Sequence, residues 1–187
     1  MKVLLVEDDY LQAESLINDF EEAFKDIEVR RVKTERQFRS EIQEIESFAP
    51  DLIILDIMLR WGAPFSEEQL LPEGMEDIGH WRAGFRCLEI ISNSKELYNT
   101  PVILHSVLAR EDIKEELNGL PKHVLVCRKS PSTEELFKFV RSALKELPED
   151  NLKKKGILSR LVDSSELKPG WLGIKIDLKS VFGRKKK

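Results

Sequence analysis

The stretch Ser47-Phe-Ala-Pro-Asp-Leu-Ile-Ile-Leu-Asp-Ile-Met-Leu59 decides the fold, because an uninterrupted apolar run in it ends in a carboxylate. Residues 52–55 are apolar on both faces, follow Pro50 and Asp51, and are too few for an ordinary helix, which predicts a strand buried in a parallel sheet. In such sheets the chemistry lies just beyond the carboxyl ends of the strands. Asp56 is therefore predicted to lie at the active edge of the sheet.

Similar apolar runs alternate with helical patterns along the rest of the chain. The predicted strands are residues 2–6, 27–32, 52–55, 100–106 and 123–127, and the predicted helices are residues 10–24, 34–48, 84–97, 111–117 and 132–147. In the second helix, Thr34 is the expected cap, and Glu35 and Glu41 are expected on the polar face. A strand and a helix repeated five times predict a doubly wound α/β domain, in which a five-stranded parallel sheet carries helices on both faces.

The chain divides into a domain over residues 1–147 and a basic extension over residues 148–187. The formal charge of −4 splits into −10 for the first part and +6 for the second. In the extension, apolar residues alternate with Gly, Lys and Asp over residues 172–178, which predicts a half-buried strand that must pair with another strand. Residues 61–83 are rich in Gly and Pro and follow no sustained period, so they form a predicted inserted loop. Two interpretations of the apolar side chains in this loop stay open. They cover one end of the domain, or they form a lid or a surface that binds a partner.

Composition and local sequence exclude several classes of protein. No apolar run approaches the ~20 residues that span a bilayer, and the N-terminus meets charges too soon for a signal peptide, so a cytoplasmic protein is expected. Cys87 and Cys127 lie in apolar surroundings without metal-ligand spacing, which favours two buried thiols. The extension is too short for a DNA-binding effector domain and shows no recognition-helix pattern, so sequence-specific DNA binding is not expected.

Polar residues follow four of the five predicted strands. They are Glu7 and Asp8, then Asp56, then Ser106, then Lys129. Three carboxylates in one pocket would repel one another unless a hard cation such as Mg²⁺ lay between them. A carboxylate can act as a nucleophile towards phosphorus, and a Lys cation and a Ser hydroxyl are suited to neutralise the phosphoryl oxygens. The set predicts magnesium-dependent phosphoryl transfer.

Over residues 1–147 the chain resembles a response-regulator receiver domain, which has a flavodoxin-like fold. The matching segments are Val6-Glu7-Asp8, Asp56-Ile-Met58, Pro101-Val-Ile-Leu-His-Ser106 and Arg128-Lys129. The resemblance implies that Asp56 accepts a phosphoryl group from a histidine kinase or a phosphotransfer protein. The implied magnesium ligands are Glu7, Asp8, Asp56 and the main-chain carbonyl of Met58, and the implied phosphoryl-binding residues are Ser106 and Lys129.

Three departures from the family pattern stand out. Arg60 occupies the place, four residues after the acceptor, where the family usually has Pro, and the insertion begins directly after it. The family's Lys-Pro pair has become Lys129-Ser130-Pro131. Val126 stands three residues before the lysine, where the family has a switch aromatic, so the usual relay from phosphorylation to conformational change is expected to be absent or replaced.

The function expected from the sequence is that of a phosphoacceptor without a conventional output domain. It would take a phosphoryl group on Asp56, hydrolyse it slowly, and signal through a protein partner or a second copy of the chain by way of loop 61–83 or the extension. It is not expected to be a turnover enzyme, because an aspartyl phosphohydrolase would carry Asp-x-Asp on its first strand and here Ile57-Met58 follows the acceptor. The alternative is a pseudo-receiver, a protein-interaction module that acts without phosphorylation.

Overall fold

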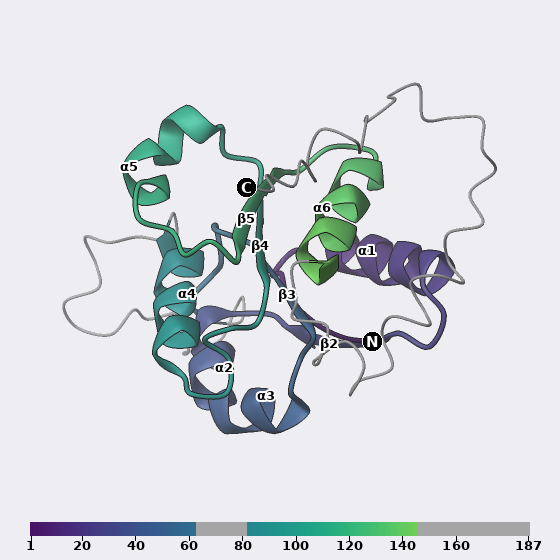
Figure 1. The fold of residues 1–187 in the computed structure, drawn as a ribbon, viewed down its shortest axis with the longest axis horizontal. Helices are drawn as coiled ribbons and strands as arrows, with labels where there is room; N and C mark the ends of the chain where they lie inside the picture. Colours follow the sequence, from purple (N-terminus) through teal and green to yellow (C-terminus); the bar gives the residue numbers. More distant parts are fainter. Residues whose placement is uncertain (63–81, 146–187) are drawn as a thin grey trace, which may run out of the picture.

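The computed structural model describes residues 1–62 and 82–145, so the predictions for residues 63–81 and 148–187 lie outside the described residues. At the centre is a five-stranded parallel sheet in the order β2-β1-β3-β4-β5 (Figure 1). The strands are β1 (Lys2–Val6), β2 (Glu28–Val32), β3 (Leu52–Leu55), β4 (Val102–Ser106) and β5 (Val124–Arg128). This is the strand order of a flavodoxin-like doubly wound sheet, so the predicted fold class is confirmed.

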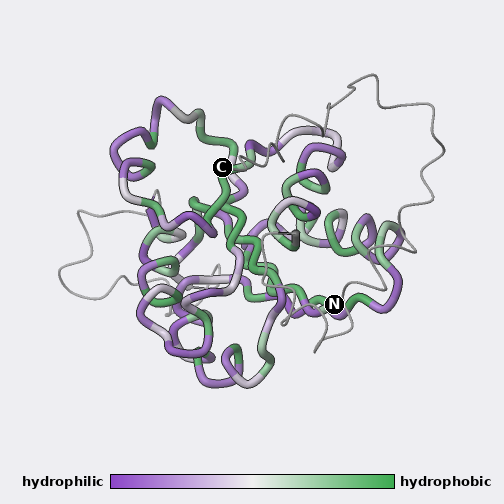
Figure 2. Tube along the Cα trace, viewed as in Figure 1, coloured by the Kyte–Doolittle hydropathy of each residue, from purple (hydrophilic) through white to green (hydrophobic). Residues whose placement is uncertain are grey.

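Helices cover both faces of the sheet. They are α1 (Tyr10–Ala23), α2 (Glu35–Ser40), α3 (Ile42–Phe48), α4 (Ala83–Asn93), α5 (Lys114–Leu117) and α6 (Glu134–Lys145), with a 3-10 turn η3 (Arg110–Ile113). Because successive strand residues point to opposite faces, β1 contributes to two cores. Leu4 packs with Phe38 of α2 and Ile91 of α4, whereas Leu5 packs with Phe20 of α1 and Val140 of α6. Figures 1 and 2 show this arrangement, with the apolar strands between the two helical layers.

Two predicted helices are wrong in their extent. The helix predicted over residues 34–48 is two helices, α2 and α3, because the backbone leaves the helical conformation at Glu41 (φ −99, ψ 15). The Glu41 carboxylate accepts a hydrogen bond from Arg30 of β2 at 2.7 Å, which holds this break against the sheet. The helix predicted over residues 84–97 ends at Asn93, because the Ser94 hydroxyl accepts the backbone N–H groups of Glu96 and Leu97 and begins a separate turn.

The described residues agree with the prediction of two buried thiols. Cys87 and Cys127 are free and buried. Burial raises the pKa of the Cys127 thiol to about 11, so this thiol is protonated and unreactive at neutral pH. Within residues 1–62 and 82–145, none of the helices has the length and apolar character needed to cross a membrane.

Candidate functional site

The site lies where the strand order reverses between β1 and β3, the place where doubly wound sheets bind their ligands. The pattern of sheet hydrogen bonds continues one residue past the strands. The backbone N–H groups of Glu7, Asp56 and Lys129 each donate to a carbonyl of the neighbouring strand, at 3.0, 2.9 and 2.8 Å. The sheet itself therefore positions three of the residues that the sequence singles out.

Lys129 joins two of the carboxylates. Its Nζ donates to Glu7 Oε2 and to Asp56 Oδ2, in both cases at 2.7 Å. The three side chains are only 10%, 2% and 7% exposed, respectively, so these are buried ion pairs. The other Asp56 oxygen, Oδ1, accepts the Met58 N–H at 3.0 Å. Carboxylate oxygens of Glu7, Asp8 and Asp56 lie within 4.8 Å of one another, so the predicted cluster is present.

The three consecutive acids after β1 have different partners. Glu7 contacts Lys129, and Asp8 forms an ion pair with Arg60, whose Nε lies 2.9 Å from Asp8 Oδ2. Asp9 accepts the Gln12 N–H at 2.9 Å and is the N-cap of α1. Since Asp9 is engaged with the helix, Glu7 and Asp8 remain the candidates to bind a metal together with Asp56.

The electrostatics of the site show an excess of negative charge. Burial raises the pKa of Glu7, and the charge of Asp56 raises it further. Burial also raises the pKa of Asp8, against the lowering effect of Arg60. Burial alone would lower the pKa of Lys129, but the carboxylates of Asp56 and Glu7 outweigh it, so the pKa of Lys129 is raised and the ammonium is charged at neutral pH.

This donor set fits Mg²⁺. The metal prefers hard oxygen ligands and usually takes only a few carboxylates while keeping bound waters. Glu7, Asp8 and Asp56 supply three such oxygens in one cluster. Burial, and to a smaller extent the charge of Asp56, raises the pKa values of Glu7 and Asp8, and a bound cation would favour their charged forms. These three side chains are the ones that would hold the ion; the Met58 carbonyl stays a prediction.

Two other predicted positions lie on strands β4 and β5. Ser106 is buried at the end of β4, and its Oγ accepts the Leu108 N–H at 3.4 Å, so its role towards a phosphoryl group stays a prediction. Val126 is half-buried on β5, opposite Leu104 in the strand register, and packs against the core under α2 and α4. An aliphatic side chain therefore fills the place of the family's switch aromatic.

The prediction that Glu35 lies on a polar face is wrong. Its side chain is fully buried and binds Arg86 of α4, with Nε 2.9 Å from Oε1, and Arg39 of its own helix, with the terminal nitrogen 2.8 Å from Oε1. The pattern of α2 alone misleads because the partner Arg86 lies 51 residues away in the sequence, beyond the insertion. The ion pair joins α2 to α4 beside the site.

Pattern reasoning missed a second cation near the site. Arg31 of β2 donates from Nε to the Glu7 carbonyl at 3.2 Å, and its guanidinium lies 5.6 Å from the centre of the Tyr10 ring. It holds the backbone of the acidic segment from the edge strand. An arginine on a half-polar edge strand carries no motif, so the sequence offered no signal for this contact.

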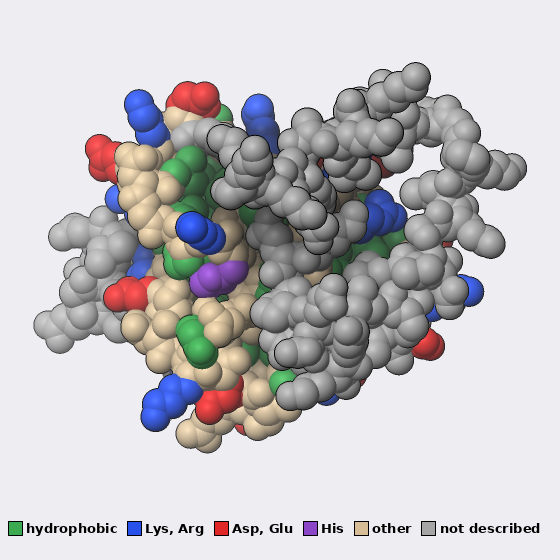
Figure 3. Space-filling model, in the orientation of Figure 1, with side chains coloured by type: hydrophobic (Ala, Val, Ile, Leu, Met, Phe, Trp, Pro, Cys, Tyr) green, Lys and Arg blue, Asp and Glu red, His purple; other side chains and the backbone are tan. Residues whose placement is uncertain are grey.

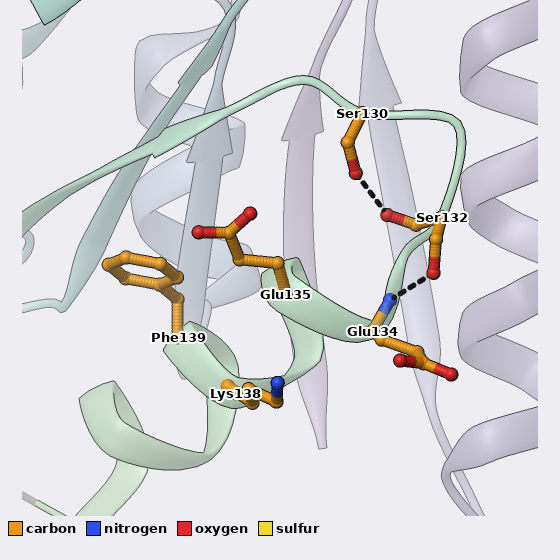
Figure 4. A pocket seen from close by; sticks show the side chains of 6 residues that line it. All are labelled: Ser130, Ser132, Glu134, Glu135, Lys138 and Phe139. Carbon is orange, nitrogen blue, oxygen red and sulfur yellow. Dashed lines mark hydrogen bonds between the residues drawn. The ribbon is translucent and has the colours of Figure 1, made fainter.

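A separate pocket of about 370 Å³ lies at the start of α6. Figure 4 shows its lining: Ser130, Ser132, Glu134, Glu135, Lys138 and Phe139. Ser130 Oγ donates to the Ser132 carbonyl, and Ser132 Oγ accepts the Glu134 N–H at 3.3 Å. The pocket contains none of the predicted site residues, and its two serines are engaged in shaping the turn into α6.

The face drawn in Figure 3 has no concentration of charge among the described residues. Acidic and basic side chains are scattered over it, and neither sign gathers in one large patch. A nucleic-acid surface requires a gathered basic patch or stripe. This face of the described residues offers none.

Replacing Asp8 tests the charge excess. The pKa of Asp8 in the folded chain is above its ordinary value of 3.8, so the folded chain binds the proton more tightly, and stability falls as pH rises through this pKa. At pH 7 without magnesium, we expect Asp8→Asn to raise the melting temperature by about 2–4 °C. Magnesium should stabilise the parent chain and leave the variant unchanged. Circular dichroism melts with and without Mg²⁺ check both effects; a variant less stable than the parent at pH 7 contradicts the charge argument.

No family model matches the sequence, and no curated protein matches it. Solved structures do match. A signal receiver domain of a two-component histidine kinase from Clostridium thermocellum has a TM-score of 0.56 at 22% identity, covering 77% of this chain and 97% of that one. The receiver domain of a sensor histidine kinase from Pseudomonas aeruginosa, described with a magnesium ion in its active-site cleft, has a TM-score of 0.55 at 16% identity, covering 78% and 98%.

A response-regulator receiver domain from Francisella has a TM-score of 0.52 at 25% identity, covering 77% of this chain and 96% of that one. The strand order and the position of the acids define a flavodoxin-like α/β protein. Within that class, the chain has the fold of a response-regulator receiver domain of two-component signalling, as its resemblance to the family implied.

Proposed function

We propose that this chain is a receiver that accepts a phosphoryl group on Asp56 in a magnesium-dependent reaction. One observation carries the proposal: Lys129 Nζ contacts both Asp56 and Glu7 at 2.7 Å in a buried cluster that also includes Asp8. A structural salt bridge needs one carboxylate for one lysine. A cluster of three carboxylates at a strand-order reversal, two of them on one lysine, is suited to a divalent cation and an anionic substrate.

The chemistry at Asp56 is a displacement at phosphorus. A carboxylate oxygen of Asp56 forms a bond to the phosphorus of a phosphohistidine, the P–N bond breaks, and the leaving imidazole takes a proton. Bound magnesium would neutralise the carboxylates and the phosphoryl oxygens. The contact of Lys129 with the Asp56 side chain supports a role for Lys129 in binding a phosphoryl oxygen, and Ser106 at the end of β4 is the proposed hydroxyl partner.

The partners follow from this chemistry. The proposed protein donor is a histidine kinase or a histidine phosphotransfer protein, either of which would present a phosphorylated imidazole. The output is contact with a protein partner through loop 61–83 or the extension at 148–187. The acyl phosphate would be hydrolysed slowly in place, so the chain acts as a phosphoacceptor and turns over no free substrate.

A second candidate is a pseudo-receiver that binds a partner without phosphorylation. Val126 supports it, because an aliphatic side chain packed in the core replaces the aromatic residue through which relatives are expected to switch. The two candidates differ in whether Asp56 carries a phosphoryl group.

Intact mass spectrometry after incubation with acetyl phosphate and magnesium decides between the candidates. We expect the parent chain to gain one phosphoryl group, a chelator to abolish the gain, and Asp56→Ala to show none. Asp19→Asn, which changes an aspartate on α1 away from the site, is the matched control and should be phosphorylated like the parent. A folded parent that gains no mass at saturating magnesium would favour the pseudo-receiver.

A further inference from the structure

Arg60 lies at the edge of the site, and the proposed function gives it no role. It follows Asp56 by four residues, its side chain is 53% exposed, and its Nε lies 2.9 Å from Asp8 Oδ2. The Asp8 side chain is only 14% exposed. The exposed Arg60 therefore contacts the largely buried Asp8 from the solvent side of the cluster.

The backbone of Arg60 is fixed by α2. The Arg60 carbonyl accepts the Glu35 N–H at 3.0 Å, and the Trp61 carbonyl accepts the Arg36 N–H at 3.0 Å. These N–H groups belong to the first turn of α2, where the helix provides no partners of its own. The loop therefore supplies the missing acceptors, and in return α2 holds the backbone from which the Arg60 side chain reaches Asp8.

The cations of the site divide the three carboxylates between them. Lys129 contacts Glu7 and Asp56, and Arg60 contacts Asp8. The two cations come from different loops, one after β5 and one after β3. A divalent ion bound by the three carboxylates would take over the charge that both cations now neutralise, and a phosphoryl group on Asp56 would bring new negative charge to the same edge.

We propose that Arg60 is the second cation of the phosphoryl site: it neutralises Asp8 until magnesium takes that carboxylate, and it then binds the phosphoryl group on Asp56. This inference rests on the proposed function and adds a residue to it. The guanidinium of arginine is suited to this task, because its planar fork of N–H donors matches phosphate oxygens in pairs. An exposed position leaves it free to move between two anions, while its anchored backbone keeps it at the site.

The proposal predicts opposite effects of Arg60→Ala on two measurements. Magnesium binding without a phosphodonor, followed by isothermal titration calorimetry, should become about fivefold tighter, because the ion no longer displaces a competing ion pair. The rate of phosphorylation by acetyl phosphate at saturating magnesium, followed by intact mass, should fall about tenfold, because one cation is lost from the transition state. Arg60→Lys keeps the charge, so its magnesium affinity and its phosphorylation rate should both lie between those of Arg60→Ala and those of the parent chain.

The matched control is Arg82→Ala. Arg82 is also an arginine, its side chain is 55% exposed, it pairs with one acid, Glu116, and it lies just before α4 at the other end of the insertion. We expect it to bind magnesium and to be phosphorylated like the parent. If it reproduces both effects of Arg60→Ala, the cause is general net charge, and the proposal is overturned.

The outcomes separate this inference from the proposed function. Tighter magnesium binding with an unchanged phosphorylation rate would make Arg60 a displaced counter-ion only and would overturn its role at the phosphoryl group. Unchanged magnesium binding would overturn its competition with the metal. If the parent chain is not phosphorylated at all, the proposed function is overturned, and so is the role of Arg60 at the phosphoryl group.

Discussion

We expect Glu35→Ala to lower the free energy of unfolding by about 3–5 kcal/mol, the usual cost of removing one partner from a buried ion pair. Glu35 is fully buried, and its carboxylate accepts hydrogen bonds from Arg86 and Arg39. The Arg86 side chain is only 14% exposed, so the variant takes the Glu35 carboxylate away from a largely buried guanidinium. Urea unfolding followed by circular dichroism measures the loss.

A matched control is Glu41→Ala. Glu41 also pairs with an arginine, Arg30, at 2.7 Å, but both side chains are 29% exposed. Solvent screens such a pair, so we expect a loss of at most about 1 kcal/mol. Equal losses in the two variants would contradict the argument from burial.

A double variant tests the ion pair directly. In Glu35→Met with Arg86→Met, both charges are replaced by apolar side chains of similar length, and no buried charge remains unpaired. We expect it to be more stable than Glu35→Ala, because in that variant the largely buried Arg86 has lost the Glu35 carboxylate. A double variant as unstable as the single one would show that packing, and not charge, is lost.

Strands β1 and β3 were predictable because each carries its own signal. Residues 52–55 are apolar in every position and buried in every position, and the same holds for residues 3–6 of β1. A strand between two helical layers needs no knowledge of its neighbours to be recognised. The position of Asp56 and Glu7 at one edge then followed from the parallel direction of the strands.

Helix α2 was less predictable because its environment lies elsewhere in the sequence. Glu35 opens the helix and reads as a polar surface residue, yet it is buried against Arg86 across the insertion. The break at Glu41 depends on Arg30 of the neighbouring strand. A long-range ion pair produces no periodic pattern in the sequence around either residue. Pattern reasoning therefore predicts that such charged residues lie on the surface.

The same limit applies to the candidate site. Strand-end reasoning named Glu7, Asp8, Asp56 and Lys129, and the described structure brings these four together. It marked Arg60 only as a departure from a family pattern. The contact of Arg60 with Asp8 depends on how the α2 N-terminus holds the loop, which becomes visible only in three dimensions.

Gly84→Ala is expected to damage both the fold and the site. A Cβ on Gly84 would lie 2.3 Å from the Asp56 carbonyl oxygen and 2.6 Å from Ile57 Cα, far inside van der Waals contact with backbone that has no flexible end to move. The Gly84 N–H also donates to the Ile57 carbonyl at 2.9 Å, so α4 begins directly against the acceptor strand. We expect a loss of about 3 kcal/mol or slightly more, at the upper end of overpacking effects.

The effect on function separates this clash from ordinary destabilisation. Relief of the clash requires α4 or the Asp56 backbone to shift, which would misplace a carboxylate of the proposed magnesium site. We therefore expect Gly84→Ala to bind magnesium more weakly even at low temperature, where it is folded. Gly119→Ala is the control, because a Cβ there meets no atom within 4 Å, and its stability should change by less than about 1 kcal/mol. Calorimetric titration with Mg²⁺ is carried out on both folded variants. If Gly84→Ala binds magnesium as tightly as the parent chain, then α4 shifts to relieve the clash and the Asp56 backbone stays in place.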